Sequence, residues 1–349
     1  MEYFTDLPNL KSLPIKRSAY SDRIAWILAE FSRLVYEELP QEKDVQELIK
    51  DIQKLAQSDA FSNKLQTRVT ALLDRSGRSE SQVESILKSH SITFLDSFVK
   101  GDTEALLAEV SSGHDQFLVL AFRGTSSPKD AFTDARAMLQ PAIGGGRAHQ
   151  GFHDGIHIIL EDIRASLLRH GGDSEKVLYI TGHSLGGAWA MLATKYLQSC
   201  NIGATYTFGC PRVADDEFYS ALRTPVYRVV HRADMVTRLP FGYGVRFFLN
   251  TIRLIPINGT KRLSEWLRRK IVGYTHYGDL IYIHGELPGE EQKDTIRVKH
   301  SPNIFILLED LCKQISNSFT NFAKDHFMVN YSNKLKHWAK LRQKQLDEQ

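Results

Sequence analysis

The chain has 349 residues, with 44 lysine and arginine against 41 aspartate and glutamate side chains, and 42% of its residues are hydrophobic. These proportions are typical of a soluble globular protein with one large domain or two smaller ones, and they exclude global disorder. A formal charge of +3 does not indicate nucleic-acid binding, and three cysteines without C-x-x-C spacing indicate neither a disulfide framework nor a metal or redox motif.

The first residues, Met1 to Asp6, include two acidic side chains and precede no apolar stretch, so they do not resemble a secretory signal. Nowhere does an apolar run approach the roughly 18 residues of a membrane span. The cysteine usage favours a reducing compartment. We therefore expect a cytoplasmic protein whose only contact with a membrane is peripheral.

Residues 1–98 are expected to form a helical region packed on the core. Apolar residues recur at helical spacing through residues 20–39, where Ser21 can cap a helix. Residues 41–90 carry two further amphipathic stripes in a polar background. No residue pattern in this region indicates chemistry.

Between residues 99 and 331 short apolar runs alternate with helical stretches. The expected strands are 105–110, 117–122, 177–181, 205–208, 226–231 and 279–283, and the expected helices are 152–169 and 185–197. Alternation at this spacing predicts an α/β fold with a mostly parallel central sheet and helices on both faces.

A buried strand, 177–181, runs into the sequence Gly-His-Ser-Leu-Gly and then into a helix. This is the setting of a nucleophile elbow, a sharp turn that lifts the hydroxyl of Ser184 out of the sheet. Residues two before and two after the serine must lack bulk in such a turn, and Gly182 and Gly186 meet that requirement. The helix N-terminus points at the serine and favours an anion formed there.

A serine nucleophile needs a base, and the base needs a carboxylate that orients it. In hydrolases with this elbow the chain order is serine, acid, histidine. Asp234 follows the expected strand 226–231 almost directly, as the acid should. Asp215 and Asp216 begin a helix, where capping explains them, and Asp279 begins a strand.

The base is harder to choose from spacing. Five histidines follow the candidate acid, and a single histidine is more often structural than catalytic. The candidates are His276, His284, His300, His326 and His337.

Several motifs in the same order resemble the class 3, or fungal-type, lipase family of the α/β-hydrolase superfamily. They are Ala121–Thr125 (AFRGT), His149–Phe152 (HQGF), Gly182–Gly187 (GHSLGG), Phe208–Asp215 (FGCPRVAD), Asp234–Val236 (DMV) with Leu239–Pro240, and Asp325–His326 (DH) with Tyr331. The resemblance covers roughly residues 100–331. It implies an α/β-hydrolase fold, to which the N-terminal helical region is added.

The resemblance implies that His326 is the catalytic base and that His276 corresponds to a second family histidine; His276 remains the alternate base. The mechanism requires two N–H donors for the oxyanion. One is the N–H of Leu185, which follows the nucleophile, and the resemblance places the other at Thr125. A helix after Ser127 lies where family lipases carry a lid, although an ordinary surface helix fits equally well.

The sequence thus predicts a serine carboxylester hydrolase, similar to triacylglycerol lipases or phospholipases A, that needs neither a metal nor an organic cofactor. The resemblance implies a lipid ester substrate, an acylglycerol or a phospholipid. The alternative is a lipase-like lipid-binding or signalling protein without significant turnover. The oligomeric state is left open.

Residues 241–275 interrupt the family pattern with seven basic side chains and a single acidic one, Glu265, a local charge of +6. Large apolar side chains, among them Phe247, Phe248 and Trp266, lie in the same stretch, so we expect a basic amphipathic insertion that makes peripheral membrane contact. Alternatively, these apolar residues pack the insertion onto the domain. Residues 332–349 are expected to form a basic helical tail.

Overall fold

The computed structural model describes residues 2–10, 13–15, 19–39, 81–112, 115–125, 138–172, 175–232, 234, 236–239, 273–287, 296–300 and 325–348. In chain order the elements are η1 (Leu7–Asn9), α1 (Asp22–Leu34), α4 (Gln82–Lys88), β1 (Ile92–Lys100), β2 (Thr103–Ser112), β3 (Asp115–Phe122), β4 (Leu139–Pro141), β5 (Arg147–His149), α6 (Gln150–Arg169), β6 (Val177–His183), α7 (Leu185–Tyr196), β7 (Ile202–Phe208), α8 (Asp216–Tyr219), β8 (Val226–His231), η2 (Val236–Arg238), β9 (Asp279–His284), β10 (Arg297–His300) and α13 (Met328–Asp347).

Within the described residues the main sheet has eight strands, in the order β1-β2-β3-β6-β7-β8-β9-β10. In this sheet β3, β6, β7, β8 and β9 run parallel to one another, whereas β1, β2 and β10 are paired antiparallel at its two edges. The carboxyl ends of the parallel strands meet at one edge of the sheet, where open α/β sheets bind their ligands. The predicted α/β fold with a mostly parallel sheet is confirmed.

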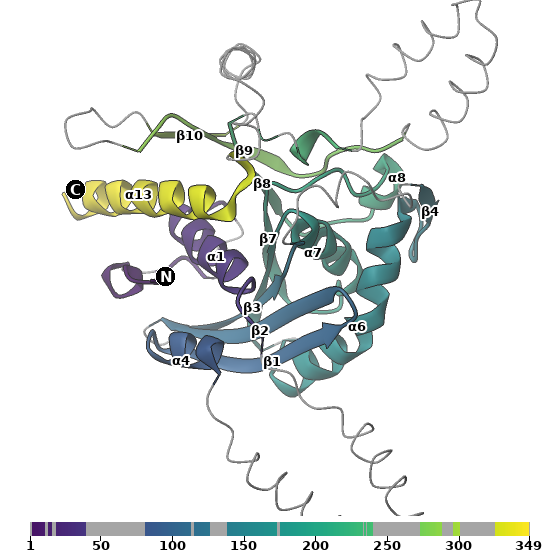
Figure 1. Ribbon diagram of the computed structural model, residues 1–349, viewed down its shortest axis with the longest axis horizontal. Coiled ribbons are helices and arrows are strands. Elements are labelled where there is room, and N and C mark those ends of the chain that lie inside the picture. Colours follow the sequence, from purple (N-terminus) through teal and green to yellow (C-terminus); the bar gives the residue numbers. More distant parts are fainter. Residues whose placement is uncertain are drawn as a thin grey trace, which may run out of the picture.

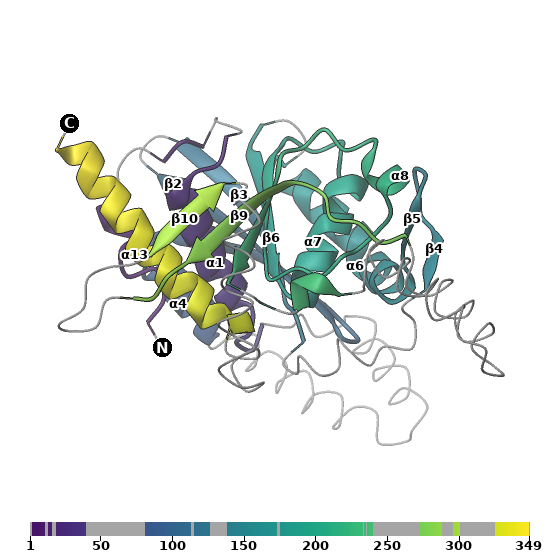
Figure 2. The ribbon, with the colours of Figure 1, turned by 90° about the horizontal axis from the view of Figure 1, so that it is seen from above.

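Helices cover both faces of this sheet. Figures 1 and 2 show α1 and α13 on one side of it and α6 and α7 on the other. Both faces are therefore apolar: in β3, positions 117, 119 and 121 join the cluster with α1, and positions 118, 120 and 122 join the cluster with α6 and α7. This alternation is the period of two that a strand imposes.

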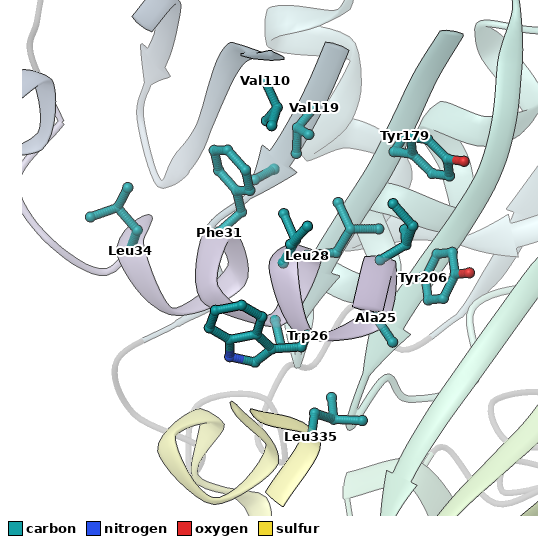
Figure 3. Packing of buried hydrophobic residues seen from close by; sticks show 14 of the residues in the cluster. Ala25, Trp26, Leu28, Phe31, Leu34, Val110, Val119, Tyr179, Tyr206 and Leu335 are labelled. Atoms are coloured by element: carbon teal, nitrogen blue, oxygen red, sulfur yellow. The ribbon is translucent and has the colours of Figure 1, made fainter. Parts of the chain in front are cut away.

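The cluster on the α1 side extends from the sheet to the C-terminal helix. Figure 3 shows Leu28 and Phe31 of α1 near Val119 of β3, and Trp26 between α1 and α13. Leu335 of α13 is fully buried in the same cluster. Helix α1 begins at the predicted cap, because the Ser21 side chain accepts a hydrogen bond from the N–H of Ile24 at 3.4 Å.

Two of the domain boundaries that we expected fall inside elements. The boundary after residue 98 crosses β1, which pairs with β2 along its length, and the boundary after residue 331 crosses α13. The helical segment of 41–80 lies outside the described residues. Across the described parts of the chain, no helix combines the length and the apolarity that crossing a membrane requires.

Candidate active site

Ser184 lies on a tight turn between β6 and α7. Its backbone is left-handed, with φ 56° and ψ −124°, which is costly for a residue with a side chain. A Cβ on Gly182 would overlap the backbone of Gly186, so the strand and the helix can approach this closely only when residue 182 lacks a side chain. The turn places the serine at the N-terminal end of α7.

The loop after β3 packs directly against this turn. A Cβ on Gly186 would overlap the carbonyl oxygen of Phe122, and a Cβ on Gly124 would lie 3.4 Å from the Cβ of Ser184. The predicted oxyanion donors belong to these two segments. Leu185 is the first residue of α7, where an N–H has no intrahelical partner, and the half-buried Thr125 follows Gly124 directly.

The structure brings Ser184, His326 and Asp234 into one hydrogen-bonded chain. His326 Nε2 lies 2.9 Å from Ser184 Oγ, and His326 Nδ1 lies 2.8 Å from Asp234 Oδ2. All three side chains are buried. An imidazole in this position can accept the serine proton, and the carboxylate holds the ring and stabilises its positive charge.

Gly209 makes room for the acid and the base. It follows β7 with φ +58°, and a Cβ at this position would lie 2.7 Å from Asp234 Oδ2 and 3.1 Å from His326 Nδ1. Any larger residue would press on the contact between the carboxylate and the imidazole. Gly209 lies in the FGCPRVAD motif that carries the family resemblance, but no role in the site was predicted for it from the sequence.

His276, the alternate base, lies outside the hydrogen-bonded chain. Its Nε2 is 2.7 Å from the carbonyl oxygen of Thr237, and the Thr237 hydroxyl donates to the carbonyl oxygen of Asp234 at 2.7 Å. Burial, and then the charges of Arg228 and Arg212, lower the pKa of His276, so the ring stays neutral and supports the loop after the acid.

The other carboxylates that we considered have structural partners. Asp215 caps α8 by accepting from the N–H of Phe218 at 3.1 Å, and it pairs with Arg147 at 2.8 Å. Asp279 begins β9 and is exposed. The order serine, acid, histidine along the chain therefore predicted Asp234, the carboxylate that the structure places beside His326.

A second set of polar contacts links the oxyanion loop to the base. Burial and the neighbouring His326 lower the pKa of His183, so its ring is neutral. His183 Nε2 donates to the carbonyl oxygen of His326 at 2.7 Å, and Tyr36 Oη donates to Nδ1 at 2.9 Å. The N–H of Gly124 in turn donates to Tyr36 Oη. Sequence reasoning missed Tyr36, which lies 147 residues from His183.

Two predictions fall largely outside the described residues. They are the helix after Ser127 and the insertion 241–275. Of the insertion, the structure describes only residues 273–275. In the described parts of the chain, no group of three histidine, cysteine, aspartate or glutamate side chains has the arrangement of a metal site.

Comparison with known proteins places part of the chain in a family. Residues 119–244 match the family model for lipase (class 3). A lipase of Rhizomucor miehei is 32% identical over 158 residues, which cover 41% of this chain and 43% of that protein. Phospholipase A1-Igamma1, chloroplastic, of Arabidopsis thaliana is 24% identical over 271 residues, which cover 61% of this chain and 49% of that protein.

Secreted mono- and diacylglycerol lipase 1 of Fusarium solani is 36% identical over 137 residues, 36% of this chain and 41% of that protein. The chain thus spans less than half the length of these curated relatives. A crystal structure of a lipase from Rhizopus microsporus var. chinensis is 22% identical, with a TM-score of 0.45, over 74% of this chain and 79% of that one. Over residues 119–244, the chain is therefore similar to the class 3 lipase family.

Proposed function

We propose that the protein is a serine carboxylester hydrolase that acts on lipid esters. The observation that supports this best is the hydrogen-bonded chain on the elbow, in which His326 joins Ser184 Oγ at 2.9 Å and Asp234 Oδ2 at 2.8 Å. Lipases and a phospholipase A1 among the relatives support a lipid ester as the substrate.

In the proposed reaction, His326 takes the proton of Ser184 as Oγ attacks the ester carbonyl carbon. Asp234 stabilises the imidazolium, and the N–H of Leu185, together with Thr125, binds the oxyanion. The C–O bond to the leaving alcohol breaks as His326 returns the proton to that oxygen. Water, deprotonated by His326, then hydrolyses the acyl-enzyme.

Hydrolysis of a fluorogenic ester by the wild type and by Ser184→Ala tests this proposal. We expect the variant to lose about 10⁴- to 10⁶-fold in kcat and to lose labelling by a fluorophosphonate probe. Ser220→Ala is the matched control, because this exposed serine caps α8 by donating to the carbonyl oxygen of Glu217. Activity of Ser184→Ala within tenfold of wild type would exclude the nucleophile.

The alternative function makes the opposite prediction for the wild type. A lipid-binding or signalling protein without turnover would bind vesicles but would neither hydrolyse esters nor react with the probe. Acylglycerol and phospholipid substrates are separated by comparing diacylglycerol emulsions with phosphatidylcholine vesicles of the same acyl chains. Release of fatty acid from only one of them assigns the headgroup preference.

We also propose that residues 241–275 hold the protein at an anionic membrane surface, on the cytoplasmic side. The local charge of +6 and the apolar side chains in the same stretch support this role. The three cysteines, which show no disulfide framework in their spacing, support a reducing compartment. Reversing the charges of Arg268, Arg269 and Lys270 should weaken binding to anionic vesicles without changing hydrolysis of a short-chain ester. Unchanged vesicle binding would exclude the membrane role.

A further inference from the structure

Two buried histidines donate hydrogen bonds to consecutive carbonyl groups of the segment that carries the base. His231 Nδ1 lies 2.9 Å from the carbonyl oxygen of Asp325, and His183 Nε2 lies 2.7 Å from the carbonyl oxygen of His326. Both side chains are almost completely buried. A carbonyl oxygen can only accept, so each of these two ring nitrogens carries a hydrogen.

The second nitrogen of each ring has its own partner, which fixes the tautomer. Lys334 Nζ lies 2.8 Å from His231 Nε2, and because an ammonium group can only donate, that nitrogen accepts. Tyr36 Oη lies 2.9 Å from Nδ1 of the neutral His183. The two rings therefore hold opposite tautomers, His231 with hydrogen on Nδ1 and His183 with hydrogen on Nε2.

These two histidines end the strands that carry the other members of the site. His183 is the last residue of β6 and precedes Ser184, and His231 is the last residue of β8, three residues before Asp234. The base itself belongs to no strand of the sheet. These hydrogen bonds and the packing of α13 tie its main chain to the same two strands.

We propose that His183 and His231 form a carbonyl clamp, two positioning residues that set the distance between the catalytic imidazole and Ser184. This inference rests on the proposed hydrolase function. The carbonyls of residues 325 and 326 flank the Cα of His326, so the clamp fixes where its side chain begins. A displacement of about 1 Å at a reacting group can cost on the order of 100-fold in rate.

Asparagine and glutamine substitutions test the clamp because their amides reach different ring positions. The asparagine amide lies near the place of Nδ1, and the glutamine amide near that of Nε2. His231→Asn and His183→Gln can therefore keep the donation to the carbonyl. His231→Gln and His183→Asn keep only the contact with Lys334 or Tyr36. At each position, one variant is the matched control for the other.

We expect the two variants that lose the carbonyl contact to be about 10- to 100-fold lower in kcat than the two that keep it. KM for a soluble ester should change little, because neither histidine is expected to touch substrate. Thermal unfolding of all four variants measures the structural damage, which should be similar within each pair. Equal kcat for asparagine and glutamine at both positions would overturn the clamp.

A measurement on the wild type keeps the test independent of turnover and of variant folding. The ¹⁵N chemical shifts of the imidazoles should show hydrogen on Nδ1 of His231 and on Nε2 of His183, with variants serving only for assignment. The opposite tautomer at either position would exclude the clamp, because the ring nitrogen beside the carbonyl oxygen would then carry no hydrogen. If these tautomers are found and the wild type hydrolyses no ester, the proposed function fails while the hydrogen-bond geometry stands.

Discussion

Asp234 has no contact with solvent, and its oxygens accept three hydrogen bonds from the protein. Oδ2 accepts from His326 Nδ1 at 2.8 Å and from Tyr331 Oη at 2.7 Å, and Oδ1 accepts from the N–H of Val236 at 3.0 Å. Burial of a carboxylate is unfavourable unless donors replace its water. Burial, and then the charge of Asp234, raise the pKa of Tyr331, so the phenol keeps its proton and remains a donor.

Tyr331→Phe should therefore lower kcat by about tenfold with little change in KM. The variant leaves a buried carboxylate short of one donor, a loss worth about 1–3 kcal/mol, and weakens its hold on the imidazole. Tyr277→Phe is the matched control, because this hydroxyl donates to the carbonyl of Leu222 at 3.0 Å and takes no part in the site. Equal kcat for the two variants would remove Tyr331 from the mechanism.

The two histidines that the sequence left in competition differ in what their loss should do. His326→Ala should lose nearly as much activity as Ser184→Ala, and the double variant little more, because members of a triad act as a unit. His276→Ala removes only the hydrogen bond to the carbonyl of Thr237 and should cost much less. Steady-state kinetics on one ester checks both variants, and the reverse order would show that His276 is the base.

Among the elements, the sequence predicts the inner strands of the main sheet but neither of the two strands at its edges, β1 and β10. The strand 226–231 was expected with the bounds at which β8 is found, since its neighbours on both sides demand apolar residues. β1 was not expected, because residues 1–98 were assigned to a helical region, and that assignment is wrong for residues 92–98. In the structure Asp96 lies at the sheet edge, where it accepts from Ser166 and pairs with Arg169 at 2.9 Å. Such a partner cannot be identified from local spacing.

The C-terminal helix was expected as a basic tail, but one side of it is part of the core. Leu335 is fully buried, whereas Leu346, eleven residues later on the same helix, is 50% exposed. The basic composition of residues 332–349 correctly predicted the exposed side of α13, but it gave no sign that the other side is buried. Only the position of α1 shows which residues of α13 are covered.

Leu335→Ala should therefore lower the free energy of unfolding by about 2–5 kcal/mol, the usual cost of emptying a buried leucine site. Leu346→Ala, on the same helix and exposed, should change it by less than about 0.5 kcal/mol. Denaturant unfolding measures both. If the two variants were equally stable, α13 would not be docked on α1.

On the scale of the whole molecule, Asp325 links stability to pH. Burial raises its pKa to about 6, although Arg232 and Lys334 oppose the shift and Asp234 and Glu286 add to it. An unfolded aspartate titrates near 4. The folded protein thus binds more protons between pH 4 and about 6, so this group's contribution to stability is present at pH 4 and is lost as the pH rises through 6.

Asp325→Asn should remove that dependence. Relative to the wild type, the variant should become more stable between pH 4 and pH 7, by at most about 3 kcal/mol for a shift of two pH units. Urea unfolding at both values measures the change, and Asp102→Asn, in an exposed turn, is the control. A difference from the wild type that does not vary with pH would exclude this assignment.

For the site as a whole, the sequence predicts those residues whose role follows from the neighbouring sequence. The elbow has fixed spacing, and the acid follows a strand; the base was chosen from five histidines only by family resemblance. No such signal marks Tyr36 or His231, because each acts through partners that the fold brings together from distant parts of the chain. His231 and Lys334, for example, lie 103 residues apart.

The wide separation of the site along the chain also bears on how the protein is made. Ser184 precedes His326 by 142 residues, and the segment with His326 leads directly into the helix that packs on α1. Domains generally fold from the N-terminal side as the ribosome delivers them. A growing polypeptide would therefore expose its nucleophile and acid long before a base reached them. The hydrolase that we propose would thus stay inactive during synthesis until the segment with His326 has reached Ser184 and Asp234.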